Sequence, residues 1–189
     1  TAISNQLFYN ADNLQSITLP NSVKLIGESA FYDCNNLKSI TIPNGVVSIG
    51  NSAFGYCTAL DSIRYNAINC PSVPSNIFDY CSNLNTVFIG DDVEIIPANL
   101  LYDEDNVQKV ILGNNVTKIG ENAFWSCNNL TDINIPVSVD SIGNRAFYDC
   151  SSLPVENYIR YADSYAIELT DKNQTTYTLK ENTRFLGSE

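Results

Sequence analysis

The sequence repeats itself with a period of 23 residues over most of its length. The two most similar units read Cys-Asn-Asn-Leu-x-x-Ile-x-Ile-Pro and begin at Cys34 and Cys127. A unit this short carries about eight apolar positions, too few to bury a core alone, so neighbouring units must stack and share one core. The most regular position holds an aromatic residue or leucine at intervals of 23, 23, 24, 23, 23 and 23: Phe8, Phe31, Phe54, Phe78, Leu101, Phe124 and Phe147.

Within one unit the apolar residues are spaced as in a short β-strand. Ile40 and Ile42 alternate with polar residues behind Leu37, and a proline turn follows them. Val46 and Ile49 form a second apolar stretch that is too short for a helix. With parallel strands about 4.8 Å apart, about seven such turns form a solenoid roughly 35 Å long. One column of the alignment predicts a single interior ladder: Leu37, Leu60, Leu84, Val107 and Leu130.

The repeat unit resembles a known family. The string Cys-x-x-Leu-x-x-Ile-x-Ile-Pro-x-x-Val-x-x-Ile-Gly-x-x-Ala-Phe is similar to the BspA-type leucine-rich repeat, over residues 1–153 and again over 177–187. The resemblance implies a leucine-rich-repeat right-handed solenoid with a parallel sheet on its concave side and short 3₁₀ or extended segments on its convex side. It also implies a secreted or cell-surface bacterial protein that acts in adhesion.

Two functions are consistent with this resemblance. The first is a non-catalytic extracellular scaffold that binds a protein or a glycan, and the second is a structural spacer that displays another domain. Both ends of the chain fall inside a repeat, so we expect it to be part of a longer protein or to meet a neighbouring chain at its ends.

The regular pattern breaks after Leu153, and the sequence predicts one domain in three parts. Residues 1–153 form the solenoid, residues 154–176 form an inserted β-hairpin, and residues 177–189 resume a truncated repeat. The hairpin is predicted because apolar residues alternate on both sides of turn signals in this stretch. It is either a connector between blocks of repeats or a recognition loop.

Composition excludes several classes of function. Ten basic and 21 acidic residues give a net charge of −11, which argues against nucleic acid as a partner. The apolar runs are too short to span a membrane. The absence of histidine removes the Ser-His-Asp triad, Cys-His pairs and histidine metal sites, so we expect no enzyme, no metal and no cofactor. The acidic runs 91–94 and 103–105 lack the spacing of a calcium loop and are predicted to be a solvated edge.

Five of the six cysteines occupy one column of the alignment: Cys34, Cys57, Cys81, Cys127 and Cys150. The other members of this column are Ala11 and Glu104, and an alanine equivalent favours small buried thiols over disulfides. Because a buried carboxylate is costly, the turn at Glu104 is predicted to bulge outward. A glycine column is interrupted by Pro74 and Pro97, so it is predicted to be a tightly packed corner that needs neither a positive φ nor a backbone donor.

Two surfaces are candidates for binding. The outward positions of the predicted concave strands are mostly small hydroxyl residues, but Arg64, Phe88 and Ile111 lie side by side with Lys109 near them. These four residues are the predicted ligand-binding site, unless a bend or another chain covers them. The alternative is an aromatic ridge suited to contacts with protein or sugar, unless its rings only cover the edge of the core. The predicted members of this ridge are Tyr32, Tyr102, Trp125 and Tyr148.

Overall fold

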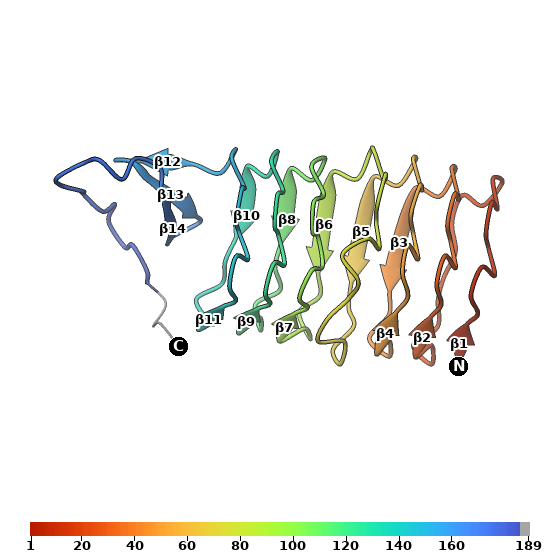
Figure 1. The fold of residues 1–189 in the computed structure, drawn as a ribbon. Coiled ribbons are helices and arrows are strands. Elements are labelled where there is room, and N and C mark those ends of the chain that lie inside the picture. Colours follow the sequence, from red (N-terminus) through yellow and green to blue (C-terminus); the bar gives the residue numbers. More distant parts are fainter. Residues whose placement is uncertain (186–189) are drawn as a thin grey trace.

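The repeats wind into a single β-solenoid in the computed structural model, which describes residues 1–185 (Figure 1). One side of the solenoid is a parallel sheet of five strands from successive turns, which we call the long sheet. Pairing advances by one repeat, as between Ser39 and Ser62, so equivalent residues stand next to each other. The strands of the long sheet are β3 (Ser39–Ile42), β5 (Ser62–Tyr65), β6 (Thr86–Ile89), β8 (Lys109–Ile111) and β10 (Asp132–Asn134).

On the opposite side, six turns contribute a strand of only two residues, and the turn of Ser72 contributes only an isolated bridge to Ala98. These strands form two separate parallel sheets of three strands each. No helix occurs within residues 1–185, and accordingly none there that could span a membrane. The predicted parallel solenoid with short extended segments is therefore confirmed. The two small sheets are β1 (Ala2–Ile3), β2 (Leu25–Ile26) and β4 (Ser48–Ile49), and β7 (Ile95–Ile96), β9 (Lys118–Ile119) and β11 (Ser141–Ile142).

Alternation along the strands places the apolar side chains inside. In β3, Ile40 and Ile42 are buried, whereas Ser39 and Thr41 are exposed, as expected when successive side chains point to opposite faces. All five residues of the predicted interior ladder are fully buried, and they belong to one continuous cluster. The prediction of a single shared core is confirmed. No turn has a core of its own, so each turn depends on its neighbours for burial.

A stack of phenylalanine rings runs through this core. Phe31 lies 5.0 Å from Phe8 and 5.3 Å from Phe54, measured between ring centroids, with nearly parallel planes. Each column cysteine is buried beside the stack and donates its thiol proton to the carbonyl of the stack residue one turn earlier, as Cys57 Sγ does to Phe31 O at 3.0 Å. Burial raises the pKa of the Cys150 thiol to about 12, so this group stays protonated and unreactive.

All six cysteines are free and buried. We therefore expect alkylation of the unfolded, unreduced chain to label six cysteines, as measured by mass spectrometry, and expect the folded chain to be labelled slowly. Prior reduction is expected to add no further label. Loss of labels in pairs would reveal disulfides and contradict the structure.

The glycine column is a tightly packed corner, as predicted. A Cβ atom on Gly50 would lie 2.4 Å from the backbone nitrogen of Glu28, and none of the described glycines has a positive φ. The prediction that this corner needs no backbone donor is wrong where glycine is present. Gly50 donates its N–H to Ile26 O at 2.8 Å, and Gly120 donates to Ile96 O at 2.9 Å. Pro74 and Pro97 have no N–H, so these two positions of the column cannot donate this hydrogen bond between turns.

The prediction that Glu104 is exposed is also wrong. Its side chain occupies the interior column of the cysteines, and only 6% of the residue is exposed. The turn does not bulge outward because the ladder residue Val107 and the stack residue Leu101 on either side of it are fully buried. Burial raises the pKa of the Glu104 carboxyl to about 9, and the nearby Asp79, Asp103 and Asp105 contribute to the shift. Glu104 is therefore protonated at neutral pH, which removes most of the cost of burying it.

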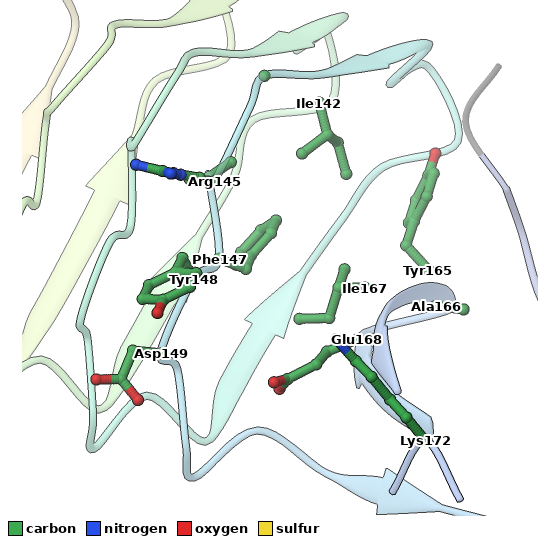
Figure 2. A pocket seen from close by; sticks show the side chains of 12 residues that line it. Ile142, Arg145, Phe147, Tyr148, Asp149, Tyr165, Ala166, Ile167, Glu168 and Lys172 are labelled. Atoms are coloured by element: carbon green, nitrogen blue, oxygen red, sulfur yellow. The ribbon is translucent and has the colours of Figure 1, made fainter. Parts of the chain in front are cut away.

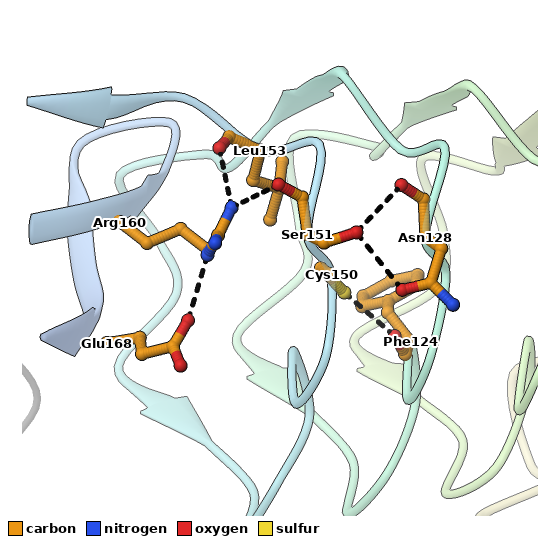
Figure 3. A network of polar contacts seen from close by, with 7 residues as sticks. All are labelled: Phe124, Asn128, Cys150, Ser151, Leu153, Arg160 and Glu168. Carbon is orange, nitrogen blue, oxygen red and sulfur yellow. Dashed lines mark hydrogen bonds and ion pairs between the residues drawn. The ribbon is translucent and has the colours of Figure 1, made fainter. Parts of the chain in front are cut away.

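An antiparallel sheet of three strands follows the last turn: β12 (Val155–Glu156), β13 (Ile159–Ala162) and β14 (Tyr165–Leu169). Figure 3 shows how Arg160 fastens this hairpin to the solenoid: its guanidinium binds Glu168 and the carbonyl oxygens of Ser151 and Leu153. Residues 177–179, where the repeat was predicted to resume, form no strand. The resumed repeat remains a prediction, and its residues 186–189 lie outside the described part of the chain.

Candidate functional site

The long sheet brings the four predicted binding residues together. Arg64 on β5 pairs with Phe88 on β6, and Phe88 pairs with Ile111 on β8. Lys109 is two residues before Ile111 on β8, and it pairs with Thr86 and Asp132 on the neighbouring strands. Phe88 and Ile111 are only half-buried, so residues 1–185 leave this apolar centre partly open to solvent.

Charged side chains frame the apolar centre in different ways. The Arg64 guanidinium carbon lies 5.0 Å from the centroid of the Phe88 ring, within the range of a cation–π contact. Lys109 and Asp132 form an ion pair with their charged atoms 2.5 Å apart. No carboxylate of the described residues pairs with Arg64. Arg64 therefore keeps its charge and its hydrogen-bond donors available to a ligand.

Arg64 also separates two depressions on the surface. One has a volume of about 210 Å³ and lies over the long sheet beside Phe88. The other, of about 440 Å³, lies at the turns that follow the strands and is lined by amide and carboxylate side chains as well as Arg64. A ligand that covers both depressions would meet the Phe88 ring and hydroxyl groups on one side of the guanidinium, and amide and carboxylate groups on the other.

The aromatic ridge consists of two separate stacks. Ring centroids within each stack lie 4.4 to 5.6 Å apart. The first stack contains Tyr9, Tyr32, Tyr56 and Tyr80, and the second contains Tyr102, Trp125 and Tyr148. Between them, Asp79 occupies the position at which most other turns place a ring.

This stacking limits what the ridge can bind. Sugars stack on the open faces of aromatic rings, whereas the inner rings of each stack use their faces to contact neighbouring rings. Trp125, for example, lies 5.6 Å from Tyr102 and 4.4 Å from Tyr148, measured between centroids. The Arg145 guanidinium carbon lies a further 5.4 Å from the Trp125 ring. The faces of the inner rings are therefore occupied, and only rings at the ends of a stack, such as Tyr80, have a free face, which favours the long sheet over the ridge.

A pocket of about 410 Å³ lies between the last turn of the solenoid and the hairpin (Figure 2). Its apolar walls are Ile142 and Phe147 from the turn and Ile167 from β14, and Tyr148 is the only predicted site residue that lines it. Reasoning from the sequence missed this pocket. It depends on how the hairpin docks, and the repeat pattern carries no information about that contact.

The repeats of this chain match those of a known family. The sequence model of the family described as "BspA type Leucine rich repeat region" matches residues 1–131 and 117–189, with six copies. The stacked parallel turns of about 23 residues are those of a leucine-rich-repeat solenoid. The chain belongs to the BspA-type leucine-rich-repeat family.

Solved structures of bacterial leucine-rich-repeat proteins share this fold. The T. pallidum leucine-rich-repeat protein is 29% identical, with a TM-score of 0.62, over 81% of this chain and 71% of that one. A leucine-rich cell surface protein from Faecalibacterium prausnitzii is 30% identical, with a TM-score of 0.54, over 82% of this chain and 41% of that one. A leucine-rich-repeat protein from Eubacterium ventriosum is 28% identical, with a TM-score of 0.61, over 90% of this chain and 41% of that one. None of the curated proteins matches the sequence.

Proposed function

We propose that this chain is a non-catalytic scaffold on the bacterial cell surface that binds an extracellular protein through the long sheet. The observation that carries the proposal is the half-buried pair Phe88 and Ile111, flanked by the unpaired cation of Arg64. An apolar centre with a charged rim is typical of a protein interface. The cell-surface location is supported by the F. prausnitzii relative, which is described as a cell surface protein.

The parallel register supports the choice of this surface. Side chains from successive turns meet at the spacing of neighbouring strands, so a flat partner can contact several turns without a deep pocket. Arg64 can donate several hydrogen bonds in a fixed geometry while its guanidinium remains over the Phe88 ring. The second candidate is a structural spacer, in which this surface binds nothing.

The variant Phe88→Ser is expected to weaken binding to a protein ligand by at least about tenfold, because it removes the centre of the apolar patch. The ligand is first identified by screening the purified chain against arrays of extracellular matrix proteins and of glycans. Affinity is then compared for wild type, Phe88→Ser and Trp125→Ser. Both variants must keep the wild-type melting temperature within a few degrees, which corresponds to roughly 1 kcal/mol.

The comparison separates the candidate functions. Loss of binding in Phe88→Ser alone supports the long sheet. Loss in Trp125→Ser alone moves the site to the aromatic ridge, and an effect of neither variant rejects both surfaces. If no protein and no glycan binds to the wild-type chain, the spacer function is favoured.

A further inference from the structure

The solenoid has a seam between the turns of Phe78 and Leu101. In the other turns that have a following turn, the N–H of the stack residue donates to that turn, as Phe31 does to Ala53 O at 2.8 Å. Neither the N–H of Phe78 nor that of Tyr80 has an acceptor within residues 1–185. The pairing is also offset in these turns: Ser72 pairs with Ala98, 26 residues later, where regular turns pair at 23.

An acidic notch of about 310 Å³ opens at this seam. Four carboxyl groups line it, and no basic side chain does. Glu104 is the innermost of them: only 6% of the residue is exposed, and its carboxyl group makes no hydrogen bond to any part of the chain that the structure describes, whereas its backbone carbonyl accepts from the Val107 N–H. The carboxyl oxygens are not completely sealed from solvent, so they face the notch and have no partner in the described chain to compete with a ligand. We define the acidic notch by its lining residues: Asp79, Tyr80, Cys81, Asp103, Glu104, Asp105 and Asn106.

Tyr80 supplies an aromatic wall to the acidic notch. It is the last ring of the first stack, 4.4 Å from Tyr56, and 66% of the residue is exposed. Its φ is 61°, a left-handed conformation that costs a bulky residue stability. Equivalent positions with the same conformation mostly hold aspartate, asparagine or serine, as at Asp103 with a φ of 62°. Tyr80 therefore has a strained backbone although its exposed ring adds little to the core. Strained residues of this kind cluster at functional sites.

We propose that the acidic notch binds the side-chain cation of a partner protein, the guanidinium of an arginine or the ammonium of a lysine. Carboxylates supply the acceptors that such a cation needs, and the Tyr80 ring supplies a cation–π contact. The described residues contain no group of three histidine, cysteine or acidic side chains arranged to hold a metal ion. This geometry favours an organic cation, and the proposal is independent of the ligand of the long sheet.

Binding of the cation displaces a proton from Glu104. In the free protein, burial and the neighbouring carboxylates raise the pKa of Glu104 to about 9, so the group is neutral at pH 7. The titratable groups around it are Asp79, Tyr80 and Cys81 from one turn, Asp103 and Asp105 from its own turn, and Cys127 from the next. None of these neighbours is basic. An arriving cation favours the ionised carboxylate, so affinity is expected to rise with pH by up to about tenfold per unit below pH 9.

The probe is the blocked tripeptide acetyl-Gly-Arg-Gly-amide, and its control is the same peptide with neutral citrulline in place of arginine. Both are titrated into the ¹⁵N-labelled chain at pH 6 and pH 7.5, and affinity is read from backbone amide shifts. The arginine peptide is expected to shift the amides of residues 79–81 and 103–106 and to bind more tightly at the higher pH. The citrulline peptide is expected to shift neither group.

Two variants that each remove one acidic group test the role of Glu104. Glu104→Gln is expected to bind the arginine peptide more weakly and with little dependence on pH, whereas the exposed Glu121→Gln is expected to behave as wild type. Equal, pH-dependent binding by Glu104→Gln would overturn the proposal, as would shifts confined to other residues. Saturable shifts of the same amides by millimolar CaCl₂ alone would overturn it in favour of a metal site.

Discussion

Phe54→Ala is expected to lower the free energy of unfolding by about 3–5 kcal/mol, the range for removing a fully buried phenylalanine. The Phe54 ring has no exposed surface and lies between Phe31 at 5.3 Å and Phe78 at 5.5 Å, measured between ring centroids. Its loss therefore leaves a cavity that two neighbouring turns share. Urea denaturation followed by circular dichroism measures the change.

The matched control is Phe185→Ala, which makes the same chemical change where 64% of the residue is exposed. It is expected to change stability by no more than about 0.5 kcal/mol. A loss well below 1 kcal/mol for Phe54→Ala would show that adjacent turns collapse into the cavity. The stack would then not be the rigid element that its geometry indicates.

The repeat alone predicted most of this fold, because the same column must occupy the same environment in every turn. The interior ladder of Leu37 and its equivalents follows from that rule, and so do the free thiols such as Cys57, which all point in one direction beside the stack. The pairing of Arg64, Phe88 and Ile111 across the long sheet was predictable for the same reason. Residues at the same position of successive repeats must lie next to each other, so these contacts can be predicted without knowing the side-chain conformations.

The features that the sequence did not predict arise where one turn differs from the others. Glu104 was recognised as an exception, but the assumption of a charged carboxylate led to an exposed position that the structure contradicts. The seam depends on how the turn of Ser72 packs against the next turn, where Ser72 pairs with Ala98. The ridge was predicted as a row of rings, whereas the orientation of Trp125 between its two neighbours depends on side-chain packing. Docking of the hairpin is a contact between unlike segments, so no repeat pattern describes it.

Glu104 is expected to make the stability of the solenoid fall as pH rises. Its pKa in the folded chain is raised to about 9 from the ordinary value of 4.5, so between these values the folded state holds a proton that the unfolded state has lost. The stabilisation from this proton is complete below about pH 4.5 and is lost progressively up to about pH 9. The slope is about 1.4 kcal/mol per pH unit, which amounts to about 4 kcal/mol between pH 5 and pH 8. Burial also raises the pKa of Asp79, which acts in the same direction.

Glu104→Gln isolates this contribution, because an amide of similar shape carries no titratable proton. The variant and wild type are expected to have similar free energies of unfolding near pH 5, and the variant is expected to become the more stable one by about 4 kcal/mol at pH 8. Urea unfolding at each pH measures the difference, with Glu121→Gln as the control because Glu121 is exposed.

Glu104→Cys is a second test, because it restores the thiol that other turns have at this position. In those turns the thiol donates to the carbonyl of a stack residue, as Cys127 does to Leu101 O at 3.1 Å. It too is expected to exceed wild type in stability at pH 8. Parallel pH profiles for wild type and Glu104→Gln would mean that Glu104 is charged in the folded chain, and the acidic notch would then have no proton to exchange for a cation.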